Sequence, residues 1–130
     1  MSTHATGSLS VKHWEEKPYS EIEGGPKLTH VEGINTYSGD IEGEGTLAYL
    51  MIYGEKGVEY SGMERVAGRM GGKSGSFILR HTGTYVDGVA KNESSIIPGS
   101  ATGEFRGISG RGTMNADHEK ALYTLDYDFE

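Results

Sequence analysis

The segment 58–85 constrains the fold of this chain more than any other part of it. It holds two stretches of alternating polarity separated by Gly71-Gly72, a pair that favours the tight turn of a β-hairpin. Further glycines recur inside both stretches, at positions 62, 68, 75 and 83. Because glycine inside a strand costs stability, this repetition indicates strands that bend sharply or approach other backbone closely. Such strands are typical of a sheet that closes on itself.

Turn-forming residues recur at similar intervals along the rest of the chain, and the stretches between them also alternate in polarity. This pattern predicts eight strands, near residues 5–16, 27–38, 43–53, 58–70, 73–85, 88–98, 108–115 and 120–129. No stretch of about ten residues has helical periodicity, and the best helix candidates are single turns at 102–106 and 117–121. An even number of antiparallel strands tends to close, since closure removes exposed edges. We therefore expect an all-β chain, a single eight-stranded antiparallel β-barrel over residues 1–130, with residues 1–4 flexible.

Charge and composition argue against several classes of function. The net charge is −7, which disfavours binding to nucleic acid and to anionic membranes. The chain has no cysteine, and its five histidines are not spaced as neighbouring metal ligands, so neither a metal nor a cofactor is expected. The start of the sequence does not resemble a signal peptide, and no apolar stretch is long enough to cross a bilayer. A cytoplasmic location is the expectation.

Residues 67–74, Ala-Gly-Arg-Met-Gly-Gly-Lys-Ser, approach the pattern of a phosphate-binding loop. That loop works only between a strand and a helix, because amides at the helix N-terminus converge on the anion. Here the residues that follow read as a strand. The segment is therefore interpreted as a hairpin turn rather than a nucleotide site.

Glu64 and His81 are the residues most suited to chemistry. Residues equidistant from the Gly71-Gly72 turn should lie opposite each other, which pairs Glu64 with Leu79 and His81 with Gly62. Both ionisable side chains then lie on one apolar face, as diagonal neighbours. A carboxylate and an imidazole inside a barrel form a plausible acid–base pair, because burial and mutual charge tune both groups. A buried ion pair with a purely structural role explains the same pattern equally well.

Aromatic and apolar residues on the expected inner face are candidates for contact with a ligand. An aromatic lining with hydroxyl groups suits an apolar molecule that carries a few oxygens, although ordinary core packing explains most of these residues too. The candidates are Tyr49, Tyr60, Val66, Phe77, Leu79 and Tyr85.

Motifs spread over nearly the whole chain resemble one known family. They are Gly25-Pro26-Lys27-Leu28, residues 37–45, residues 63–66, residues 75–83, residues 98–104 and residues 123–129. In combination they resemble the bacterial family named domain of unknown function 3224. The resemblance implies an eight-stranded antiparallel barrel similar to that of plant allene oxide cyclase, an isomerase without a cofactor. It implies no established activity, since a fold alone does not carry function.

Three functions remain open from the sequence. The first is a cofactor-independent isomerase or cyclase that acts on a small apolar molecule, with Glu64 and His81 moving protons. The second is a non-catalytic carrier of a hydrophobic ligand, and the third is an oligomeric structural or stress-related protein whose interior is filled. A homo-oligomer, most simply a two-fold dimer, is expected for all three, because the apolar residues exceed what one small barrel can enclose.

Overall fold

The structure is a computed structural model that describes residues 2–130. These residues form nine β-strands and no helix. The strands are β1 (Thr3–Ser20), β2 (Lys27–Gly39), β3 (Ile41–Gly54), β4 (Gly57–Met70), β5 (Lys73–Val86), β6 (Val89–Ile96), β7 (Thr102–Gly103), β8 (Ile108–Ala116) and β9 (Ala121–Phe129). The expected all-β fold is confirmed, and all eight expected strands are present.

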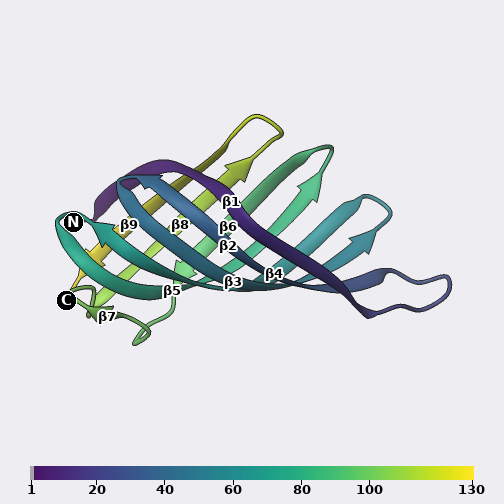
Figure 1. The fold of residues 1–130 in the computed structure, drawn as a ribbon, viewed down its shortest axis with the longest axis horizontal. Helices are drawn as coiled ribbons and strands as arrows, with labels where there is room; N and C mark the ends of the chain where they lie inside the picture. Colours follow the sequence, from purple (N-terminus) through teal and green to yellow (C-terminus); the bar gives the residue numbers. More distant parts are fainter. Residues whose placement is uncertain (1) are drawn as a thin grey trace.

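The strands form one antiparallel sheet that closes into a ring (Figure 1). Within residues 2–130 the order is β4-β3-β2-β1-β9-β8-β6-β5, and β4 and β5 also pair with each other, which completes the ring. The two-residue strand β7 pairs with β5 beside the ring. Closure satisfies the backbone groups that an open sheet would leave at its edges.

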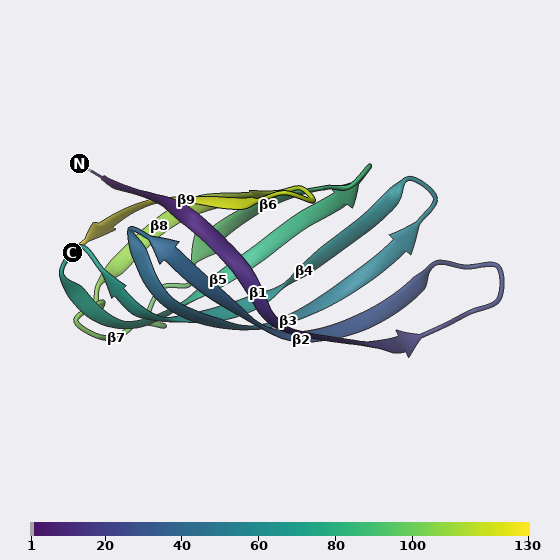
Figure 2. The same ribbon diagram turned by 45° about the horizontal axis from the view of Figure 1, so that its top comes forward.

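The connections lie at two ends of the ring (Figures 1 and 2). The hairpins that join β1 to β2, β3 to β4, β5 to β6 and β8 to β9 project to one side, here named the hairpin end. The two chain termini and the turns after β2 and β4 lie at the opposite side, here named the terminal end. The candidate site lies on β4 and β5, between these two ends.

Glycine turns set the register of the central hairpins. Gly71 and Gly72 have φ angles of 60° and 79°, and Asp87 and Gly88 have 53° and 78°. Positive φ at both central residues matches the right-handed twist of the flanking strands. The turn at Gly71-Gly72 places Glu64 opposite Leu79, so the predicted register is confirmed.

Alternate residues of each strand point into the ring and bury two apolar clusters. The larger cluster includes Val66, Phe77, Leu79 and Phe105. The smaller cluster, formed by Val31, Leu47, Tyr49 and Met51, lies nearer the hairpin end of β2 and β3. The interior is therefore apolar on both sides of the polar site.

The segment after β6 covers the terminal end of the ring. Phe105 is 1% exposed, and its ring packs edge-on against Phe77 with centroids 5.5 Å apart. The single helical turns considered for 102–106 and 117–121 are not formed: Thr102–Gly103 is strand β7, and 117–120 is a tight turn. Their short polar and glycine residues favour turns over helix.

Some apolar side chains remain on the outer face. Leu50, Ile52 and Met63, on β3 and β4, are 41%, 44% and 48% exposed. Such a row suits a contact between subunits, and the expected dimer stays a prediction. No helix among residues 2–130 has the length and apolarity needed to cross a membrane.

Of the segment 1–4, Met1 lies outside the described residues. Thr3 and His4 belong to β1 and pair with Tyr127 and Asp126 of β9. The flexibility expected for this segment stays a prediction.

Candidate functional site

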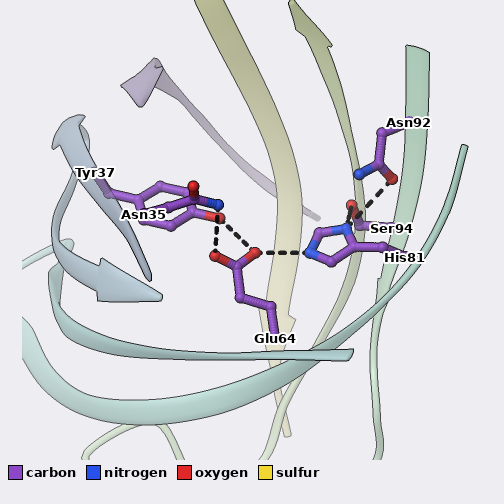
Figure 3. Close-up of polar contacts among 6 residues, drawn as sticks. All are labelled: Asn35, Tyr37, Glu64, His81, Asn92 and Ser94. Carbon is purple, nitrogen blue, oxygen red and sulfur yellow. Dashed lines mark hydrogen bonds and ion pairs between the residues drawn. The ribbon is translucent and has the colours of Figure 1, made fainter. Parts of the chain in front are cut away.

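Glu64 on β4 and His81 on β5 both point into the ring and touch each other (Figure 3). The Oε1 atom of Glu64 lies 2.7 Å from the Nε2 atom of His81. The two residues are 1% and 3% exposed. The residues that the sequence places on one face therefore form a direct, buried carboxylate–imidazole contact.

Two side chains from β2 donate hydrogen bonds to the same carboxyl group. The hydroxyl of Tyr37 donates to Oε1 of Glu64 over 2.7 Å, and Nδ2 of Asn35 donates to Oε2 over 3.1 Å. An ionised carboxylate only accepts hydrogen bonds, so these two donors match this form. The Nε2 atom of His81 then carries the hydrogen and donates it to Glu64.

The other ring nitrogen of His81 faces β6. Its Nδ1 atom lies 2.9 Å from Oγ of Ser94 and 3.3 Å from Oδ1 of Asn92. With the hydrogen on Nε2, Nδ1 presents a lone pair and accepts a hydrogen bond from the Ser94 hydroxyl. The polar network thus runs from β2 across β4 and β5 to β6 (Figure 3).

Gly45 on β3 leaves the space that the Glu64 carboxylate occupies. A Cβ atom at position 45 would overlap the Oε2, Cδ and Cγ atoms of Glu64. Gly45 pairs with Val66, two residues along β4 from Glu64. The absence of a side chain at position 45 therefore decides where the carboxylate can lie.

A small void lies beside the pair. Its volume is about 20 Å³, and its lining includes Glu64, His81, Ser94, Tyr49 and Leu79. Such a space holds about one water molecule. In this conformation the interior is therefore almost filled around the pair.

The residues expected to contact a ligand do not surround one space. Tyr49 and Leu79 line the void, whereas Tyr60 borders an open hollow of about 750 Å³ whose lining also includes Leu50 and Ile52 of the outer face. Val66 and Phe77 are packed in the larger apolar cluster and line neither space. Their roles in ligand binding stay predictions.

The aromatic contacts connect the pair with the hairpin end. The ring of Tyr49 lies edge-on to that of His81, with centroids 5.8 Å apart, and 5.1 Å from the ring of Tyr60. Tyr85 is 48% exposed near the end of β5, so this candidate lies away from the interior.

Three tyrosines near the site have raised pKa values. Burial, and then the negative charge of Glu64, raise the pKa of Tyr37 and Tyr49 well above the ordinary value of 10.0. Burial raises the pKa of Tyr60 to about 12. These hydroxyl groups stay protonated in the folded chain under ordinary conditions.

We expect stability to fall as the pH rises from about 10 towards 12. In this window the unfolded chain, with ordinary tyrosine pKa values, has lost more protons than the folded chain, so alkali favours unfolding. A titration followed by tyrosinate absorbance should show a late stage that coincides with the loss of circular dichroism.

Tyr49→Phe should reduce that late stage, whereas Tyr19→Phe, at a residue that is 66% exposed, should leave it unchanged. Complete ionisation of all tyrosines while the dichroism persists would contradict the expectation.

Four residues of the network were not identified from the sequence. They are Asn35, Tyr37, Asn92 and Ser94. A signal for two of them existed, because residues equidistant from the Asp87-Gly88 turn lie opposite each other. That rule pairs Ser94 with His81 and Asn92 with Gly83, as found.

In the part of the chain that the structure describes, no group of three His, Cys, Asp or Glu side chains lies close enough together to bind a metal ion. The carboxylate and imidazole of the pair are instead occupied by each other and by neutral hydrogen-bond partners. The arrangement can hold and move a proton.

Comparison with known proteins identifies the family of the chain. The family model described as "Protein of unknown function (DUF3224)" matches residues 5–127, and no curated protein matches. The chain is also similar to the crystal structure of a protein of unknown function from the DUF3224 family of Shewanella oneidensis MR-1. The two are 26% identical with a TM-score of 0.87, and the match covers 100% of this chain and 99% of the other. These matches concern DUF3224 and not allene oxide cyclase. The family model spans nearly the whole chain, and on that ground the protein belongs to the DUF3224 family.

Proposed function

We propose that the protein is a small-molecule-binding β-barrel that transfers a proton within a bound apolar molecule, as a cofactor-independent isomerase. The observation that carries the proposal is the buried contact between Glu64 and His81 beside a void. Catalytic acids and bases are commonly found in such enclosed, hydrogen-bonded pairs. The proposal includes that the closed sheet is a barrel similar to that of allene oxide cyclase.

His81 is the group that moves the proton. Glu64 accepts the hydrogen of Nε2, so Nδ1 keeps a lone pair, which takes a proton from a bound molecule once that molecule displaces the Ser94 hydroxyl. The negative charge of Glu64 stabilises the imidazolium that results. Return of the proton at a neighbouring carbon completes an isomerisation, while the hydroxyl of Tyr37 keeps its hydrogen bond to Glu64.

Entry of a substrate requires side chains to move, since the void holds only about one water molecule. Tyr60 lies nearer the hairpin end than Glu64 on the same strand, and it contacts Tyr49 beside His81. Rotation of these two rings would open the interior beside His81 toward the hairpin end of the ring. The substrate would enter from the hairpin end.

The small void also favours an alternative, in which the filled interior serves stability alone. The protein would then be an oligomeric structural or stress-related protein. A third function is a non-catalytic carrier of a hydrophobic ligand. It needs the same opening of the interior as the isomerase but no proton transfer.

Glu64→Gln tests the proposal. Cyclohexanone in deuterated water serves as the probe, and nuclear magnetic resonance measures deuterium incorporation next to its carbonyl group. We expect the native chain to accelerate exchange and the variant to lose about a hundredfold of that acceleration, since acid–base catalysis contributes factors of this size. Glu59→Gln, an exposed change on the same strand, is the matched control and should retain the exchange rate.

If the native chain, Glu64→Gln and Glu59→Gln all exchange deuterium at the same rate, proton transfer by Glu64 and His81 is excluded. If Glu64→Gln retains tight binding of the probe without exchange, the catalytic proposal holds. If the native chain neither binds nor exchanges the probe, while Glu64→Gln lowers stability, the structural alternative replaces it.

A further inference from the structure

We propose that Ser94 is a nucleophile for acyl transfer, with His81 as its base and small esters as its substrates. The inference rests on the proposed use of Glu64 and His81 as an acid–base pair. Its starting point is a chain of three groups: Glu64 Oε1 lies 2.7 Å from His81 Nε2, and His81 Nδ1 lies 2.9 Å from Ser94 Oγ. A hydroxyl within hydrogen-bond reach of a base that a third group orients is the general arrangement of an activated nucleophile.

The direction of each hydrogen bond supports this order. The carboxylate of Glu64 is surrounded by donors, so the imidazole donates to it through Nε2. The lone pair of Nδ1 therefore faces the Ser94 hydroxyl, which donates to it. The ring nitrogens exchange the roles that they have in many serine hydrolases, but carboxylate, imidazole and hydroxyl remain in sequence.

Asn92 supplies an observation independent of this chain. Its Oδ1 atom lies 3.3 Å from Nδ1 of His81, where it can accept a hydrogen bond once that nitrogen is protonated. Its Nδ2 atom is buried and makes no hydrogen bond of normal geometry among residues 2–130, although the hydroxyl of Tyr60 lies close enough for Asn92 to lower the pKa of that tyrosine. A buried donor without a well-formed hydrogen bond is costly, so a ligand acceptor would compete with Tyr60 for it. The carbonyl oxygen of a bound ester would fill this position.

Ser94 is also the most accessible member of the three. It is half-buried, and it lines both the internal void and an open hollow of about 410 Å³ on the other side of the wall. Ser94 pairs with Gly112 on β8 and with the inward-pointing His81 on β5, so its hydroxyl faces the void while the hollow lies against its backbone. A small acyl group would reach the hydroxyl from the interior, once side chains around the void move.

The reaction balances with water as the only co-reactant. As Oγ of Ser94 bonds to the ester carbonyl carbon, its proton passes to Nδ1 of His81. The bond from that carbon to the alkoxy oxygen breaks, and the leaving alcohol takes the proton from the imidazolium. Water then attacks the acyl-serine in the same way, which releases the carboxylic acid and restores Ser94. Glu64 remains ionised throughout.

The test is labelling of the full chain with a fluorophosphonate, followed by intact and peptide mass measurement. We expect one phosphonyl group on Ser94 in the native chain and none in Ser94→Ala. The adjacent Ser95→Ala is the matched control and should be labelled like the native chain. Hydrolysis of p-nitrophenyl acetate should fall to the uncatalysed rate in Ser94→Ala alone. Absence of labelling in the native chain, or equal labelling in Ser94→Ala, would overturn the proposal.

A second pair of variants uses the absence of cysteine from the chain. In Ser94→Cys the thiol should be alkylated by iodoacetamide about tenfold faster than in Ser95→Cys, since His81 removes its proton. Equal rates, or a slower reaction in Ser94→Cys, would count against activation by His81.

Cyclohexanone exchange separates the two proposals. If the native chain is not labelled but its exchange still depends on Glu64, only the proposed role of Ser94 is excluded. If Ser94 is labelled but Glu64→Gln does not change the exchange rate, the isomerase is excluded and Ser94 is retained as a nucleophile.

Discussion

Replacing His81 with leucine is expected to lower the free energy of unfolding by about 3 to 5 kcal/mol, because it leaves the buried Glu64 carboxylate without its imidazole partner. Glu64 is 1% exposed, so its carboxylate depends on hydrogen-bond donors inside the ring. The hydroxyl of Ser94 loses its acceptor at the same time. Urea denaturation followed by circular dichroism measures the change.

His118→Leu provides the control, because the side chain of His118 is 88% exposed and that of Glu119, its carboxylate neighbour, is 76% exposed. That change should alter stability by no more than about 0.5 kcal/mol. The double change Glu64→Gln with His81→Leu should cost less than the sum of the single changes, since the two groups interact directly. Additive losses would show that the pair contributes no coupling energy.

Gly45→Ala is expected to destabilise the chain by about 3 kcal/mol, which combines overpacking with the loss of hydrogen bonds to a charged group. The added methyl group would occupy the position of the Glu64 carboxylate. That carboxylate is the mobile end of its side chain, but hydrogen bonds to Tyr37, Asn35 and His81 hold it in place. Moving it therefore disrupts the whole network.

Gly54→Ala, on the same strand, is the control for this substitution. A Cβ atom there would meet nothing closer than the carbonyl oxygen of Gly57 at 3.7 Å, and Gly54 does not have positive φ. Its midpoint in urea should stay close to that of the native chain. A Gly45→Ala variant that unfolds at the same urea concentration as Gly54→Ala would show that the carboxylate relocates without cost.

The buried pair can serve stability and chemistry together. Both variants at positions 81 and 45 act on one carboxylate, so their losses of stability report how firmly it is held. A firmly held carboxylate also fixes the tautomer of His81, on which both proposed reactions depend. Stability measurements therefore do not replace the exchange and labelling experiments, which read the chemistry directly.

Local sequence signals determined much of the fold. Turn residues and alternating polarity located the strands, and Gly71-Gly72 determined which residues of β4 and β5 face each other. Alternation alone placed Glu64 and His81 on one face, because a shift of two residues in register preserves the face. The rule extends to the Asp87-Gly88 turn, where it pairs Ser94 with His81. Short hairpins encode these contacts within a few residues of chain.

Contacts between strands distant in the chain were decided only by the tertiary structure. Tyr37 and Asn35 reach Glu64 from β2, across the space that Gly45 leaves open on β3, and no local pattern specifies that approach. Phe105 likewise reaches Phe77 from an irregular segment. The size of the void follows from how all these side chains fill a closed ring. Hairpin register depends on local turns, whereas interior volume depends on the simultaneous packing of every inward residue.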